Sequence, residues 1–231
     1  MTYGIRDTYN ARLTPDYFAD VTSDGKLWQC DVIPIAAYLA RVNHSKTLVD
    51  IGCGRGHKIE PYTHEFNVIG VDYGANIDYC KQAYTKGAWL HCDLENEIPA
   101  IAHDDLKNAV VICSDVIEHL VNPENLVRTL AAFAVCAKAV ILTTPDRQRV
   151  YGYDHNGAPG NPHHVREWTL SELGQWLADY PFGFQWAGWT LNNDHDREHN
   201  TQMFILSRQG AALDLGVMDD LFALQAVQHV V

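Results

Sequence analysis

Residues 47–56 read TLVDIGCGRG, an apolar run that contains an acid and passes directly into glycines at every second position. The apolar run predicts a buried strand, and the glycines allow a tight turn in which the backbone approaches a ligand closely. Sixteen residues beyond Gly56 stands Asp72, at the end of the next apolar run, where a carboxylate can accept both hydroxyls of a ribose. Together these features predict a pocket for an adenosine-type ligand.

The spacing of the glycines separates two kinds of adenosine ligand. Dinucleotide-binding proteins carry G-x-G-x-x-G, whereas Gly52, Gly54 and Gly56 are spaced two and two. Asp50 precedes the first glycine and can take a charged amino group, which S-adenosylmethionine has and NAD lacks. We therefore expect S-adenosylmethionine as the ligand of this loop, with a purely structural turn as the alternative.

Strand and helix patterns alternate along most of the chain. Continuous apolar runs of strand length are separated by segments with helical periodicity, which predicts a mainly parallel sheet covered by helices on both faces. Thr169 with Glu172 three residues later predicts a helix start with a capping box. We expect strands at 47–51, 67–72, 89–92, 109–113, 139–143, 184–190 and 201–207, helices at 28–41, 76–85, 124–137 and 218–230, and a loop at 146–164.

Length and composition favour a single domain. A chain of 231 residues with 47% hydrophobic and 20% charged residues is typical of a globular protein with one sizeable core. We divide it into an N-terminal lid or helix segment at 1–45, a catalytic core at 46–208 and a helical tail at 209–231. No apolar run is long enough to cross a bilayer and the start lacks a signal-peptide pattern, so we expect a cytoplasmic protein with no membrane partner.

The stretch from Leu48 to about Pro145 resembles the class I S-adenosylmethionine-dependent methyltransferases. The resemblance rests on four successive motifs, namely the glycine loop at 50–56, Val71-Asp72-Tyr73, Cys92-Asp93-Leu94 and Ser114-Asp115-Val116. It implies a Rossmann-like α/β fold, with a seven-stranded mixed sheet whose last strand is antiparallel and with flanking helices. It also implies the cofactor-binding residues, which are Asp50, Gly52, Cys53, Gly54, Gly56, Asp72, Tyr73, Asp93, Leu94 and Ser114.

A cluster of possible metal ligands follows the fourth predicted strand. Asp115, Glu118 and His119 are spaced i, i+3 and i+4, so a helical turn that begins there places all three on one face. Two carboxylates and an imidazole at the C-terminal edge of a parallel sheet suit a hard divalent cation such as Mg²⁺. The alternatives are that Glu118 and His119 only begin the next helix, or that they act as acid and base without a metal.

A later segment, residues 161–169 with the sequence NPHHVREWT, bears on this choice. An Asp-x-x-Glu-His element followed by His-x-x-Glu-Trp-Thr resembles the small-RNA 3′-terminal 2′-O-methyltransferases, in which Glu-x-x-Glu-His and a distant histidine hold magnesium over a vicinal diol. The resemblance implies Asp115, Glu118, His119 and His164 as ligands, with Asp here at the position where that family has Glu. The same segment also resembles bacterial methyltransferases that modify hydroxyls of sugars and glycans.

An alcohol acceptor fits these residues chemically. A hydroxyl is too weakly acidic to attack a sulfonium methyl at neutral pH unless its proton is removed, whereas a metal lowers the hydroxyl pKa and an imidazole can take the proton. We therefore expect His119, His164 and Glu118 to be catalytic. His163 is the candidate base if the other two histidines are ligands. Trp28 with Gln29 is expected to pack in the core, and a place in the acceptor pocket is the alternative.

These residues lead to one function and two alternatives. We expect an O-methyltransferase for a hydroxyl of a sugar, glycan precursor or other diol-bearing small molecule, assisted by Mg²⁺ or another divalent ion. An RNA 3′-terminal 2′-O-methyltransferase and a non-catalytic S-adenosylmethionine-binding scaffold are the alternatives. The net charge of −12, with only 17 Lys and Arg residues, argues against a nucleic-acid partner.

Overall fold

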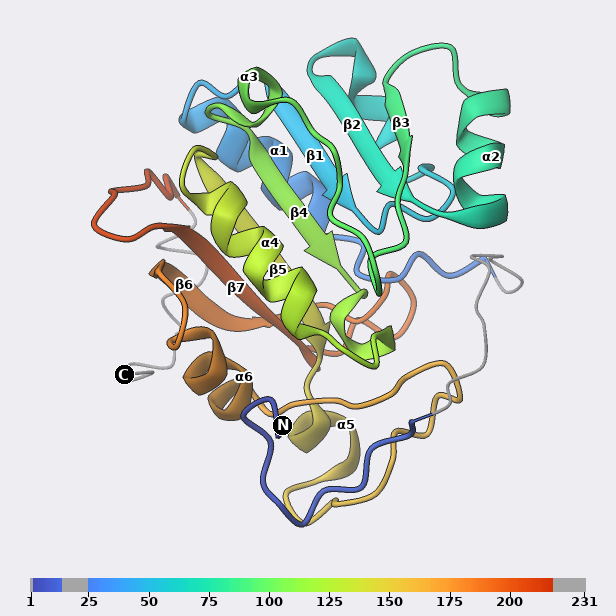
Figure 1. The fold of residues 1–231 in the computed structure, drawn as a ribbon, viewed down its shortest axis with the longest axis vertical. Helices are drawn as coiled ribbons and strands as arrows, with labels where there is room; N and C mark the ends of the chain where they lie inside the picture. Colours follow the sequence, from blue (N-terminus) through green and yellow to red (C-terminus); the bar gives the residue numbers. More distant parts are fainter. Residues whose placement is uncertain (1, 14–24, 218–231) are drawn as a thin grey trace.

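The computed structural model describes residues 2–13 and 25–217. Its strands are β1 Thr47–Ile51, β2 Asn67–Asp72, β3 Ala88–His91, β4 Val110–Ser114, β5 Ala139–Pro145, β6 Phe182–Thr190 and β7 Thr201–Arg208. They form one seven-stranded sheet in the order β3-β2-β1-β4-β5-β7-β6 (Figure 1). The strand β7 pairs antiparallel with β5 and β6, and the other four pairings are parallel. The predicted mixed sheet with its last strand antiparallel is confirmed.

Helices cover both faces of this sheet. The helical elements are α1 Val32–Val42, η1 Glu60–His64, α2 Gly74–Ala83, α3 His103–Leu106, η2 Ile117–His119, α4 Glu124–Ala134, α5 Arg147–Tyr151 and α6 Leu170–Leu177, with η for 3-10 turns. In Figure 1, α1 lies behind β1 and β4, and α4 crosses in front of β4 and β5. Because successive side chains of a strand point to opposite faces, a strand covered on both faces is mostly apolar, as β4 is from Val110 to Cys113.

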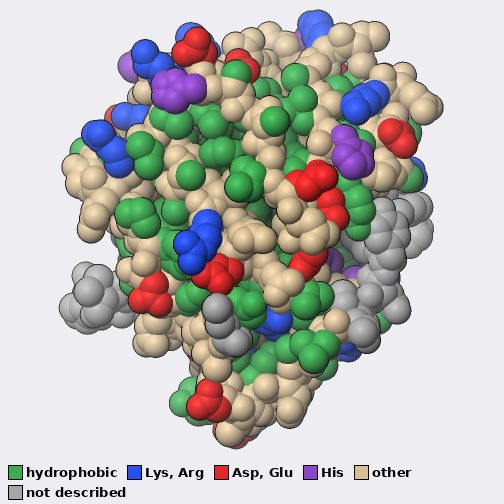
Figure 2. Space-filling model, viewed as in Figure 1, with side chains coloured by type: hydrophobic (Ala, Val, Ile, Leu, Met, Phe, Trp, Pro, Cys, Tyr) green, Lys and Arg blue, Asp and Glu red, His purple; other side chains and the backbone are tan. Residues whose placement is uncertain are grey.

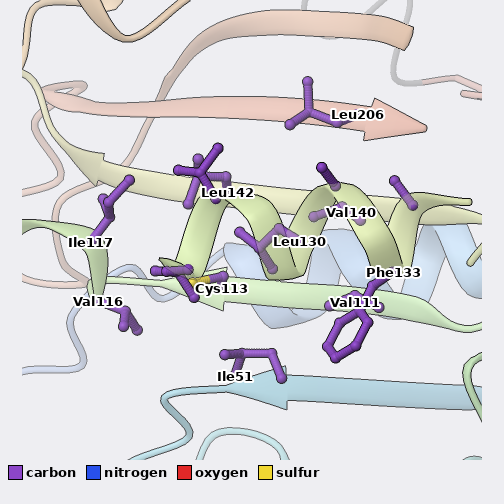
Figure 3. Packing of buried hydrophobic residues seen from close by; sticks show 14 of the residues in the cluster. Ile51, Val111, Cys113, Val116, Ile117, Leu130, Phe133, Val140, Leu142 and Leu206 are labelled. Carbon is purple, nitrogen blue, oxygen red and sulfur yellow. The ribbon is translucent and has the colours of Figure 1, made fainter. Parts of the chain in front are cut away.

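The core on the α4 side joins the helix to the central strands. Leu130 and Phe133 of α4 point towards the sheet in Figure 3, where Val111 of β4 and Val140 of β5 meet them. Both helix residues are at most 8% exposed. Burying one such side chain stabilises the fold by about 1.5–3 kcal/mol, so this packing fixes the strands whose ends carry the site.

The N-terminal helix begins later than the sequence predicts. A helix from 28 to 41 was expected, whereas α1 begins at Val32. Trp28 instead forms a β-bridge with Asn193, and Gln29 has a positive φ of 46°, a left-handed conformation that a right-handed helix cannot contain. The side chain of Asp31 accepts hydrogen bonds from the Thr190 hydroxyl and from a backbone N–H of the β6–β7 loop. These contacts hold residues 28–31 outside the helix.

The segment 146–164 is less irregular than predicted, because it contains α5. The Asp146 side chain caps this short helix by accepting hydrogen bonds from the backbone N–H groups of Gln148 and Arg149. The predicted capping box at Thr169 and Glu172 is confirmed at the start of α6. Residues 209–217 contain no helix, and the helix predicted at 218–230 lies outside the described residues.

Within residues 2–13 and 25–217, no helix combines the length and the apolar character that crossing a membrane requires.

Candidate functional site

The parallel strands point towards one edge of the sheet (Figure 1). A cavity of about 930 Å³ lies at that edge. Loops that follow β1, β2, β3, β4 and β5 supply its wall, as expected where parallel strands end. The predicted site residues that line it are Gly52, Cys53, Gly54, Asp72, Tyr73, Asp93, Leu94, Ser114, Asp115, His119 and His164. Most of the predicted cofactor residues and three of the four predicted metal ligands therefore share one cavity, and Glu118 is not in its wall.

The glycine loop has the backbone that its sequence predicts. Gly52 has φ of +80°, and a Cβ atom added there would lie 2.2 Å from Cγ2 of Val116. Gly56 also has a positive φ, but it does not line the cavity, and an added Cβ would meet the ring of Trp89 at 2.8 Å. Gly52 is thus needed where the loop passes under the cavity, whereas Gly56 lets the loop pack against β3.

Asp72, which is predicted to bind the ribose hydroxyls of the cofactor, lies at the end of β2 and is oriented by hydrogen bonds. Its Oδ2 accepts a hydrogen bond from the Gly54 backbone N–H at 2.8 Å, and its Oδ1 accepts one from the Tyr73 N–H at 2.7 Å. Asp93 is fixed in a similar way, since its carboxylate accepts from the Glu95 N–H and from the Asn96 amide. Backbone donors on two loops therefore set the orientation of both carboxylates in the cavity wall.

Asp50 does not reach the cavity surface. It is 3% exposed, and burial raises its pKa to about 7, with the negative charge of Asp72 adding to the shift and Lys58 opposing it. Asp50 is predicted to bind the amino group of the cofactor. Because Asp50 does not line the cavity, the glycine loop would separate its carboxylate from that amino group.

The proposed metal ligands come together from two loops. Glu118, His119 and His164 each offer a ligand atom, and these atoms all lie within 4.8 Å of one another. Glu118 and His119 belong to η2, while His164 returns from the segment after α5. Backbone hydrogen bonding joins the two loops, because the Val165 N–H donates to the Glu118 carbonyl at 2.7 Å.

The two imidazoles are oriented as in many protein metal sites. The Nδ1 of His119 lies 3.0 Å from the His163 carbonyl, and Nδ1 of His164 lies 2.5 Å from the Glu167 carboxylate. A carbonyl or carboxylate partner fixes the proton on Nδ1 and leaves Nε2 as the basic nitrogen. Burial, followed by the nearby His164, lowers the pKa of His119 to about 4, so this ring is neutral at pH 7.

Glu118 places a buried carboxylate beside that of Asp115. It is 0% exposed, and its Oε2 accepts from the Thr144 hydroxyl at 2.9 Å, whereas Oε1 is buried and has no hydrogen-bond partner among the described residues. Burial and the adjacent carboxylate of Asp115 raise the pKa of Glu118 well above its ordinary value. Two neighbouring carboxylates, one with an oxygen that lacks a partner, would be stabilised either by a proton shared between them or by a bound cation.

The helical face predicted for these residues is wrong. Asp115 has a positive φ of 58°, and the helical turn begins only at Ile117 as a short 3-10 turn. Asp115 consequently lies beside Glu118 but outside the group of ligand atoms that are all within 4.8 Å of one another. Its role as a fourth ligand stays a prediction.

Several residues that line the cavity were not predicted as site residues, and three of them bear on the site. Gln29 and Lys58 line the wall near the glycine loop, and Asn161 lines it near the histidines. The Asn161 amide lies 2.9 Å from Nε2 of His164, so a cation on that nitrogen would replace this contact. Trp28 and Gln29 were expected in the core, with a pocket position as the alternative, and both line the cavity because residues 28–31 are not helical.

Comparison with known proteins identifies the fold and the family. The sequence model of the methyltransferase domain family matches residues 28–186, and no curated protein matches the chain significantly. The methyltransferase domain of bacterial CtHen1-C superimposes with a TM-score of 0.58 at 22% identity, over 79% of this chain and 98% of its own. A methyltransferase from Clostridium acetobutylicum gives 0.60 at 12%, over 80% and 93%. The small RNA methyltransferase HEN1 gives 0.53 at 16%, over 87% of this chain and 27% of its own.

These three structures show the shared fold, and the family match covers the glycine loop, Asp72, Asp93 and the end of β4. Because that match spans more than half of the chain, the chain belongs to the methyltransferase domain family and is an S-adenosylmethionine-dependent methyltransferase.

Proposed function

We propose that the enzyme methylates a hydroxyl of a sugar, glycan precursor or other diol-bearing small molecule, assisted by Mg²⁺ or another divalent ion. The observation that supports this proposal most strongly is the position of Glu118, His119 and His164. Their ligand atoms cluster within 4.8 Å, and the two histidines line the same cavity as the cofactor loop. An acceptor that binds this cluster would therefore be presented to the cofactor.

The side chains suit this reaction for different reasons. A cation bound by Glu118, His119 and His164 would lower the pKa of an acceptor hydroxyl. His119, with a pKa of about 4, stays unprotonated and offers a nitrogen lone pair, which suits a ligand better than a general base. Glu167 holds the His164 ring in place through Nδ1. The sulfonium of the cofactor is itself reactive, so the main task of the protein is to position the acceptor.

The charges of the cavity wall favour an uncharged acceptor. Five carboxylate residues and one lysine line it, namely Asp72, Asp93, Glu95, Asp115, Glu167 and Lys58. Nucleic-acid affinity depends on Lys and Arg that neutralise phosphates, so such a wall is unfavourable for a polyanion. On the face shown in Figure 2, the coloured Lys and Arg side chains are scattered among acidic and apolar ones and form no continuous basic surface.

The second candidate acceptor is the 3′ end of an RNA. The metal-ligand pattern and the fold likeness to the small RNA methyltransferase HEN1 favour it, since a terminal ribose also carries a vicinal diol. The negative net charge opposes it. The scaffold alternative loses its support, because the family match is to an enzyme domain.

A transfer assay with labelled S-adenosylmethionine tests both candidates. The acceptor pool contains sugars, catechols, their singly deoxygenated analogues, and RNA oligomers that end in a diol or in a 3′-phosphate. We expect label on small diols, loss of transfer with EDTA and recovery with Mg²⁺. Replacing His164 by alanine should abolish transfer and leave cofactor binding intact, whereas His103→Ala, at an exposed histidine on α3, serves as the matched control.

Each part of the proposal has its own contrary result. Transfer that continues in EDTA would contradict the role of the cation. Label that appears only on RNA with a free diol would select the second candidate, and loss of cofactor binding in His164→Ala would mean that His164 belongs to the cofactor site.

A further inference from the structure

Gln29 lines the cavity, and only one end of its side-chain amide is hydrogen-bonded within the protein. Its side-chain oxygen accepts hydrogen bonds from the Ser114 hydroxyl at 2.7 Å and from the Thr143 hydroxyl. The residue is 2% exposed and lines the cavity, and its side-chain NH₂ has no hydrogen-bond partner among the described residues. Since the oxygen is anchored on one side, the NH₂ is the end that a ligand in the cavity can reach.

The backbone of Gln29 is held by neighbouring residues in an unfavourable conformation. Its φ of 46° is left-handed, which is unfavourable for a residue with a side chain. The Gln29 N–H donates to the Asn192 carbonyl at 2.7 Å, and its neighbour Trp28 bridges to Asn193. The β6–β7 loop therefore fixes a strained residue so that its amide sits over the ends of β4 and β5.

Lys58 brings a positive charge to the same place. Among the described residues that line the cavity it is the only Lys or Arg. Its ammonium donates to the Trp28 carbonyl at 3.3 Å, which belongs to the peptide bond that joins Trp28 to Gln29. It forms no ion pair within 4.0 Å in the described part of the chain. One ammonium and one amide, from two different segments, thus converge beside the glycine loop.

The cofactor carries one group that matches this pair. S-adenosylmethionine has a sulfonium and an ammonium, which the carboxylate-rich wall attracts, and a single carboxylate, which that wall repels. We propose that Gln29 and Lys58 form the subsite for this carboxylate, with the amide NH₂ and the ammonium as its donors. Without them the only anionic group of the cofactor would lie in a negatively charged cavity with no cationic partner.

Isothermal titration with two matched ligands tests the subsite. S-adenosylmethionine and its decarboxylated analogue share the sulfonium, the ammonium and the nucleoside, so the ratio of their dissociation constants reports the carboxylate alone. We expect the wild-type protein to bind S-adenosylmethionine about 10- to 100-fold more tightly, the usual range for a charge-assisted hydrogen bond. This measurement needs no acceptor and is independent of the proposed acceptor class.

Three variants locate the effect. Lys58→Met should reduce the ratio towards one by weakening S-adenosylmethionine only. Gln29→Glu keeps the oxygen that the Ser114 and Thr143 hydroxyls bind but replaces the NH₂ donor with an acceptor, and it should reduce the ratio too. Lys81→Met, which removes an exposed lysine from α2, should leave the ratio unchanged.

Either of two results would overturn the proposal. A wild-type ratio near one would mean that the protein does not recognise the carboxylate. A ratio unchanged in Lys58→Met, whether neither ligand is weakened or both are weakened equally, would assign the lysine to a different group. The half-buried position of Lys58 makes its variant a fair test even if Gln29→Glu fails to fold.

Discussion

Replacing Gly52 by alanine should damage the glycine loop in two separable ways. Its φ of +80° costs an L-residue roughly 1–2 kcal/mol. The added Cβ would also lie 2.2 Å from Cγ2 of Val116, an overlap whose relief typically costs about 1–3 kcal/mol. We expect Gly52→Ala to lower the free energy of unfolding by about 2–5 kcal/mol in urea denaturation, and to weaken S-adenosylhomocysteine binding.

Two further variants separate the cost of the backbone conformation from the cost of the steric overlap. Gly210→Ala has a φ of +76° with nothing within 4 Å of the new Cβ, so it should show the backbone cost alone. Val116→Ala removes the clashing methyl, and the next Val116 atom common to both side chains lies 3.4 Å from the new Cβ. The double variant Gly52→Ala/Val116→Ala should therefore be more stable than the sum of the single effects, by about 1–3 kcal/mol. Additive effects, or a Gly52→Ala cost equal to that of Gly210→Ala, would refute the reasoning.

Three further predictions concern titration, the second loop and a helix cap. With its pKa raised to about 7 from an ordinary 3.8, Asp50 binds a proton more tightly when folded, so its contribution is lost as the pH rises. Urea denaturation should show wild type losing about 2–3 kcal/mol relative to Asp50→Asn between pH 5 and pH 8, and a constant difference would count against this. Asn161→Ala should tighten Mn²⁺ binding, measured by calorimetry, because the amide no longer occupies Nε2 of His164; weaker binding would show that it supports the site. Thr169→Ala should lower stability by about 1 kcal/mol without altering methyl transfer, and unchanged stability would mean that the capping box contributes nothing.

The sheet was predictable because its strands are short apolar runs with clear ends. The bounds of 47–51 and 67–72 agree with the structure residue for residue. Asp72, Asp93 and Ser114 each stand at the end of a strand or just beyond it, where a parallel sheet exposes side chains to a shared edge. Local pattern and overall topology agree here. Spacing indicated the glycine loop and Asp72, whereas Asp93 and Ser114 came from the resemblance to a family.

The arrangement of the proposed metal ligands could not be predicted from residue spacing, because it depends on long-range contacts. Helical periodicity placed Asp115, Glu118 and His119 on one face, yet a left-handed Asp115 and a 3-10 turn bring only two of them into the compact cluster. His164 joins them through a long loop tied to η2 by backbone hydrogen bonds. Resemblance to a family suggested that return, whereas periodicity carried no sign of it.

Gln29 shows a further limit of pattern reasoning. Its neighbours have helical spacing, and the sequence therefore assigned it to a helix. The contacts that keep it out of the helix come from residues 190–193, more than 150 positions away. Long-range pairing of this kind overrides local propensity, and it places Gln29 in the cavity wall instead of in a helix.

Mn²⁺ in place of Mg²⁺ tests the proposed acceptor site most directly, by electron spin-echo spectroscopy of the protein titrated with the ion. The account predicts one tightly bound ion with nitrogen modulation from the imidazoles of His119 and His164. Glu118→Gln and His164→Ala should each abolish that signal, while His103→Ala should preserve it. A bound ion without nitrogen modulation, or equal binding by the wild-type protein and both site variants, would contradict the assignment of the cation to this cluster.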